Sequence, residues 1–151
     1  MVTWAEFEAV RPEMAAEGRR LLDRGGAREA LLATVMGDAA PRIHPINIGI
    51  VDGRLYAFLL RSAKRRDLAE DGRYALHSHQ DPDAPSEFLV RGRAMLIEAD
   101  DVRANAGATW PFDVDESYWL FDFSVEAAVL GLRPTADDWP PIYSTWAAEP
   151  A

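Results

Sequence analysis

Cysteine is absent from this chain of 151 residues, and lysine occurs only once. Without cysteine there is no disulfide and no thiolate metal site, so disulfide-framework and zinc-finger proteins are excluded. No apolar run approaches the roughly 18 residues of a membrane-spanning helix. The first residues also lack the charged start and apolar core of a secretion signal. We therefore expect a cytoplasmic protein without a membrane partner.

Positive charge is scarce as well, since 16 basic residues stand against 25 acidic ones and the net charge is −9. Nucleic-acid phosphates attract net positive surfaces, so this balance argues against a nucleic-acid partner. A chain of this length is expected to form one domain over residues 1–151.

The spacing of apolar residues is helical at first and strand-like from residue 30 onward. After helices within 1–26, it predicts helices over 62–71 and 100–108 and strands over 30–36, 42–51, 54–60, 74–79, 87–97, 121–129 and 142–146. Short turns between strands, such as Asp52-Gly53, favour an antiparallel sheet or barrel over a doubly wound fold. We expect a mainly β protein with flanking helices: N-terminal helices (1–26), a barrel core (30–97), then a helix and closing strands (98–151).

The single lysine, Lys64, lies in the densest basic run of the chain, residues 61–66. Ser62 is a plausible N-cap for a helix that begins there, and backbone N–H groups at a helix start attract anions. A phosphate at this point would accept from Ser62, from the first-turn N–H groups and from Lys64. The alternative is a solvated basic helix face.

The strand predicted over 42–51 has unequal faces, because isoleucines fill one side while Pro45, Asn47 and Gly49 leave the other small. Such a face can accept a flat ring, with Asn47 bonding to the edge of that ring. Alternatively, Pro45 and Gly49 mark a bend where a barrel closes.

Three further groups of residues have both a functional and a structural interpretation. His77 and His79 share one face of a predicted strand but lack an evident third ligand, so we expect no metal site. Arginines 19, 20, 24 and 28 form a second cationic stripe, which is either solvated or able to bind an acidic ligand tail. Trp110, Tyr118 and Trp119 suit either a dimer interface or a core.

The order of several short segments resembles the pyridoxamine 5′-phosphate oxidase-like superfamily. The segments are PRIHP (41–45), DGRLY (52–56), SAK (62–64), YAL (74–76), FLVRGRA (88–94) and LF (120–121). The resemblance implies an antiparallel split β-barrel that forms a homodimer with two flavin sites at the subunit interface.

By that resemblance, Ser62 and Lys64 match the Ser-x-Lys pair that holds the flavin phosphate, and Arg42 matches an arginine that reaches the phosphate or the ring region. The residues expected to line the isoalloxazine ring are Ile43, His44, Pro45, Asn47, Ala57, Phe58 and Leu59. The implied cofactor is FMN or, alternatively, a deazaflavin coenzyme whose acidic tail would face the arginine stripe. No residue is identified as a catalytic acid or base.

Three departures from the oxidase argue against vitamin B6 oxidation. Ala63 replaces an arginine, Phe58 stands at the position of a threonine, and the C-terminal Arg-x-Glu substrate segment is absent. The resemblance therefore implies a flavin-dependent oxidoreductase acting on an unidentified small-molecule substrate. The alternatives are a deazaflavin-dependent reductase, a non-catalytic protein that binds or buffers flavin, and a barrel that has lost its cofactor.

Overall fold

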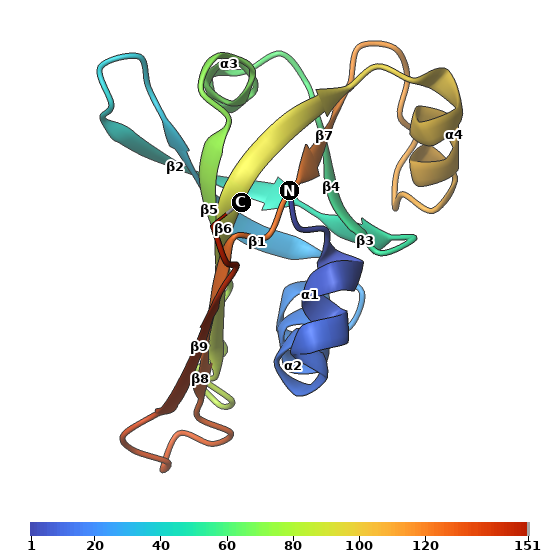
Figure 1. Ribbon diagram of the computed structural model, residues 1–151. Helices are drawn as coiled ribbons and strands as arrows, with labels where there is room; N and C mark the ends of the chain where they lie inside the picture. Colours follow the sequence, from blue (N-terminus) through green and yellow to red (C-terminus); the bar gives the residue numbers. More distant parts are fainter. Residues whose placement is uncertain (151) are drawn as a thin grey trace.

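The computed structural model describes residues 1–150 and contains four helices and nine strands in that range (Figure 1). The helices are α1 (Trp4–Val10), α2 (Pro12–Asp23), α3 (Ala63–Glu70) and α4 (Asp100–Ala108). The strands are β1 (Glu29–Val35), β2 (Pro41–Asn47), β3 (Gly49–Val51), β4 (Arg54–Leu59), β5 (Arg73–Ser78), β6 (Glu87–Ile97), β7 (Trp119–Phe123), β8 (Ala127–Leu132) and β9 (Ile142–Ala147). None of the helices in this range has the length and apolar character needed to cross a bilayer.

Local signals in the sequence account for the two N-terminal helices. Thr3 and Glu6 form a reciprocal capping box at the start of α1, with the Thr3 backbone N–H donating to the Glu6 carboxylate at 2.6 Å. Pro12 opens α2 at the position where its missing N–H costs nothing, and Arg24 ends that helix in the left-handed conformation.

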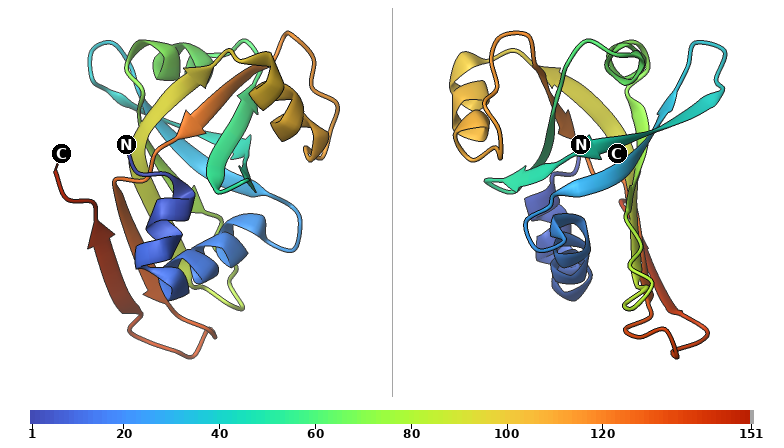
Figure 2. Two further views of the ribbon diagram at one scale, coloured as in Figure 1. Left: turned by 45° about the vertical axis from the view of Figure 1, so that its right-hand side comes forward. Right: turned by 180° about the vertical axis from the view of Figure 1, so that it is seen from behind.

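All strand pairs in residues 1–150 are antiparallel, and the sheet runs β2-β1-β5-β6-β7-β4-β3, with β8 and β9 added beside β6. The long strand β6 pairs with β5 and β8 in its first half and with β7 at its end. Figure 2 shows the resulting curl, with α1 and α2 against one part of the sheet and α3 at another. The expected antiparallel split barrel with flanking helices is confirmed.

Two predicted strands are each divided in the structure. The strand predicted over 42–51 breaks at Ile48, whose N–H donates to the Arg28 carbonyl at 2.9 Å, so β2 pairs with β1 while β3 pairs with β4. The strand predicted over 121–129 breaks at residues 124–126, between β7 and β8. There the Ser124 carbonyl approaches Gly92 of β6 so closely that any Cβ at that position would collide with it.

The main core lies between α1, α2 and the sheet and is rich in aromatic residues. Trp4, Phe7 and Phe88 are fully buried and in mutual contact, with ring centroids 5.4–6.5 Å apart. A smaller cluster around Phe58 and Trp110 lies under α4.

Candidate functional site

The start of α3 is fixed by Ser62, which has extended backbone angles and caps the helix. The Ser62 hydroxyl accepts a hydrogen bond from the Arg65 N–H at 3.3 Å and donates one to the Leu60 carbonyl at 3.0 Å. The N–H groups of Ala63 and Lys64 belong to the first turn, where a helix offers no acceptor of its own. They and the Lys64 ammonium form a cationic end that can take an anion.

Beside this helix start, the barrel is split between β2 and β4. Strand β3 pairs with β4 only as far as Tyr56, so the part of β4 from 57 to 59 continues without β3 beside it. This part of β4 lies near β2, but no backbone hydrogen-bond ladder joins β2 to β4 within residues 1–150. Strands that approach without pairing leave edge groups free to bind a ligand.

A hollow of about 230 Å³, here called the split hollow, opens at this point. It lies between the end of β2, the end of β4, the start of α3 and the connection from α4 to β7. Its lining residues are Pro45, Ile46, Asn47, Phe58, Leu59, Leu60, Ser62, Lys64, Phe112 and Tyr118. The lining is therefore mostly apolar and aromatic, with an amide and a cation, which suits a flat ring carrying an anionic group.

The structure brings six of the ten predicted site residues together in the split hollow: Pro45, Asn47, Phe58, Leu59, Ser62 and Lys64. Among the others, Ala57 is fully buried in the main core, and the Ile43 side chain is 70% exposed to solvent. Neither of them lines the hollow in this chain, nor do Arg42 and His44.

Four lining residues are not among those ten predicted site residues, namely Ile46, Leu60, Phe112 and Tyr118. Phe112 and Tyr118 come from the segment between α4 and β7, and their ring centroids are 5.7 Å apart. From the sequence, Trp110, Tyr118 and Trp119 are interpreted as interface or core residues, and Phe112 is not singled out. Leu60 and Phe112 remain 48% and 38% exposed, so the hollow has an apolar rim.

Arg42 and His44 belong to a buried polar network behind the hollow. The Asp67 carboxylate of α3, only 3% exposed, accepts from the Thr34 hydroxyl at 2.7 Å and from two nitrogens of Arg42 at 2.9 and 3.3 Å. The Thr34 hydroxyl also lies 3.3 Å from His44 Nε2. The network joins α3 to β1 and β2, and it directs two Arg42 donors to Asp67.

His44 adds no positive charge to this region at neutral pH. Partial burial lowers its pKa below the usual 6.5, and the nearby cations of Lys64 and Arg42 lower that pKa further, while Asp67 opposes them. Among the residues that line the hollow, Lys64 therefore carries the positive charge, while Arg42 is engaged in its ion pair. Arg61 and Arg65 line a neighbouring hollow that shares Ser62.

The other candidate groups are separated from the hollow. His77 lies 3.4 Å from the Glu87 carboxylate, and no cluster of three or more possible metal ligands occurs in the part of the chain that the structure describes. Three residues of the predicted arginine stripe, Arg19, Arg20 and Arg28, line a different hollow, and Arg20 also pairs with Glu17 at 2.8 Å.

The curled sheet, the split and the flanking helices form a split barrel. No family model matches the sequence, and no curated protein matches it. Eighty-one chains of solved structures do match this structure.

Three of these structures show the range of proteins that share the fold. A Clostridium acetobutylicum protein related to general stress protein 26 of B. subtilis, of the pyridoxinephosphate oxidase family, has a TM-score of 0.64 and 13% identity over 87% of this chain and 92% of its own. A NimC/NimA family protein from the same organism has a TM-score of 0.62 and 15% identity, over 86% and 93%. A heme-binding protein from Mycobacterium smegmatis has a TM-score of 0.60 and 18% identity. The match covers 86% of this chain and 57% of the heme-binding protein.

These comparisons confirm the predicted split-barrel fold. At sequence identities of 13–18%, the three structures do not assign a cofactor or a reaction to this chain. The three proteins include a heme-binding protein and members of two other families, so the shared fold does not determine the function, which depends on the chemistry of the split hollow.

Proposed function

We propose that this protein binds FMN in the split hollow and acts as a flavin-dependent oxidoreductase on a small-molecule substrate. The observation that carries the proposal is the meeting of an apolar, aromatic cavity with the cationic start of α3. FMN combines a flat ring with a phosphate, and these two surfaces suit its two parts.

The residues fit the phosphate with one rearrangement. Lys64 supplies a charge, and the N–H groups of Ala63 and Lys64 supply donors. The Ser62 hydroxyl already donates to the Leu60 carbonyl at 3.0 Å, so it must exchange that acceptor to reach a phosphate oxygen. Ala63 offers no side-chain donor, which makes Lys64 the dominant contact.

The ring would lie along Pro45, Phe58 and Leu59, with the Asn47 amide at its edge. Bound FMN would supply the two-electron chemistry, and the chain would bind and orient it. The titratable side chains that line the hollow are those of Lys64 and Tyr118. This small set favours a role in positioning over proton transfer, and it also suits the alternative of a non-catalytic protein that binds or buffers flavin.

We further propose that a second copy of the chain completes the site. A hollow of about 230 Å³ is smaller than the roughly 300–1,000 Å³ of pockets that enclose drug-sized ligands. The exposed side chains of Leu60 and Phe112 at its rim suit burial by a partner subunit. A homodimer would thus close the open side. The cytoplasmic location remains a prediction from the sequence.

The test is the absorbance spectrum of the purified protein, recorded after incubation with FMN, a deazaflavin or heme and passage through a desalting column. Retention of FMN alone supports the proposal, and gel filtration of that sample checks for the dimer. Retention of a deazaflavin alone selects the alternative coenzyme. Retention of heme alone, or of nothing, contradicts flavin binding. If FMN is retained but no reductant or substrate turns it over, the buffering alternative holds.

A further inference from the structure

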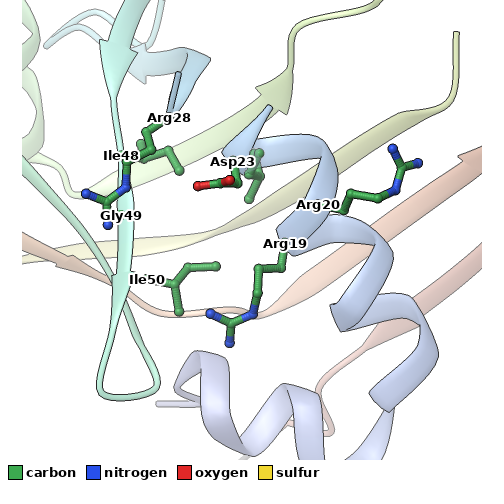
Figure 3. A pocket seen from close by; sticks show the side chains of 8 residues that line it. Arg19, Arg20, Asp23, Arg28, Ile48, Gly49 and Ile50 are labelled. Carbon is green, nitrogen blue, oxygen red and sulfur yellow. The ribbon is translucent and has the colours of Figure 1, made fainter. Parts of the chain in front are cut away.

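The predicted arginine stripe contributes to a second cavity, called here the arginine hollow, of about 270 Å³ between α2 and β3. Arg19, Arg20 and Arg28 all line it. In Figure 3, Arg19 points from α2 toward Ile50 and the Arg28 guanidinium lies beside Gly49, while the Arg20 side chain extends away. Arg20 is bound by Glu17 on its own helix. Arg19 also has a carboxylate partner, since its guanidinium lies 3.4 Å from the half-exposed Glu8 carboxylate. Three of the four arginines therefore line one hollow, and Glu17 holds the guanidinium of one of them, Arg20.

Backbone hydrogen bonds hold the polar residues of this hollow in place. The Arg28 N–H donates to the Asp23 carbonyl at 2.9 Å, and the Arg28 carbonyl accepts from the Ile48 N–H at 2.9 Å. Arg28 has a φ of +54°, a left-handed conformation that arginine seldom adopts. The site is thus organised before any ligand binds.

The Arg28 side chain is also fixed. Its guanidinium donates to the Thr109 carbonyl at 2.9 Å and lies over the Trp110 ring, 5.5 Å from the centroid. A Cβ at Gly49 would lie 2.7 Å from that ring and 3.1 Å from the Arg28 guanidinium, so glycine is required for this close approach. Arg28 keeps further N–H groups that no described residue engages.

The floor of the arginine hollow is apolar, formed by Leu22, Ile48 and Ile50. A ligand that matches this surface has an apolar body, a carboxylate to lie between Arg19 and Arg28, and a cationic donor for Asp23. We propose that the arginine hollow binds an apolar α-amino acid. The volume suits a molecule smaller than a drug, and the proposal is independent of flavin binding.

The test follows the δ1 methyl NMR signals of Ile48 and Ile50 in isoleucine-labelled protein during titration with three probes. L-Leucine should shift both signals saturably and bind at least about tenfold more tightly than 4-methylpentanoate, which lacks the ammonium group, or 3-methylbutylamine, which lacks the carboxylate. Absence of shifts at Ile48 and Ile50, or equal affinity for leucine and 4-methylpentanoate, overturns the proposal.

Variants of the charged residues separate a specific site from general attraction. Arg19→Gln and Arg28→Gln should each weaken leucine binding by about tenfold, since each removes a charge-assisted hydrogen bond. Arg24→Gln removes the same charge at the end of the same helix, from a residue that does not line the hollow, and should change leucine affinity by less than about twofold. If Arg24→Gln weakens binding as much as Arg19→Gln does, the proposal fails. If Arg28→Gln disturbs the fold, Arg19→Gln still tests the role of the arginines in leucine binding. FMN retention measured on the same samples tests the split hollow separately.

Discussion

Helices α2 and α3 both pack on β1 and β6, but they do so through different chemistry. Helix α2 buries an apolar face made of Met14, Ala15, Gly18, Leu21 and Leu22. Helix α3 buries only Leu68 and the charged Asp67, which is bound to Arg42 and Thr34 on the neighbouring strands. One helix is held by packing and the other by directional polar contacts.

The difference corresponds to the proposed role of each region. Apolar packing stabilises α2 against the sheet and tolerates small shifts, because dispersion and burial have little directionality. A buried ion pair contributes little net stability but constrains geometry. Asp67 is three residues after Lys64, so the network that holds Asp67 also sets where the cationic start of α3 faces the split hollow.

The largest effect should come from the packed region, with the change Phe88→Ala. Phe88 is fully buried against Trp4 and Phe7, and Gly18 of α2 lies against its ring. Loss of the ring should lower the free energy of unfolding by about 3–5 kcal/mol, measured by urea denaturation. A loss below about 1.5 kcal/mol would mean that α2 does not depend on this packing.

The next effect belongs to the polar network. Arg42→Met leaves the 3%-exposed Asp67 carboxylate without its ion pair, and we expect it to lower the free energy of unfolding by about 2–4 kcal/mol. The matched control is the double variant Arg42→Met, Asp67→Leu, which removes both charges and should recover part of that loss. If both proteins are as stable as the wild type, the network does not hold α3.

A smaller change in stability, with a clear change in binding, is expected for Lys64→Ala. It should weaken FMN binding by about 1.5–3 kcal/mol, the scale of a charge-assisted hydrogen bond. It should change the free energy of unfolding by less than about 0.5 kcal/mol. Arg66→Ala is the control, because Arg66 lies on the same helix outside the split hollow. Equal FMN affinities of the two variants, measured by fluorescence titration, would remove Lys64 from the site.

The contrast between the two regions also explains which elements could be predicted from the sequence. Strand β6 and helix α4 were predicted with the bounds 87–97 and 100–108 that the structure shows, because a continuous pattern ends there at clear boundaries. The predictions over 42–51 and 121–129 were wrong about continuity. Alternation reports which side chains are buried, and it continues while the backbone changes its pairing partner.

The same limit applies to the split hollow. Ser62 and Lys64 were found because a cap and a cation are local signals, whereas Phe112 and Tyr118 reach the hollow from a distant segment. Asp67 looked like an ordinary charged position on a short helix, and only the fold brings Thr34 and Arg42 to it. Arg42 was predicted to reach the cofactor, but the fold directs two of its donors to Asp67.

The smallest expected effect concerns His44, at the edge of the polar network. Its pKa is lowered in the folded protein, by burial first and then by Lys64 and Arg42, so the folded state favours the neutral imidazole. At pH values below the usual pKa of 6.5, His44 is protonated more readily in the unfolded chain than in the folded protein. The free energy of unfolding therefore decreases as the pH is lowered through this range. His44→Gln should therefore make the loss of unfolding free energy below about pH 6.5 shallower. An NMR titration of the His44 ring checks the premise directly: a pKa at or above 6.5 would show that burial and the cations of Lys64 and Arg42 do not lower the pKa of His44.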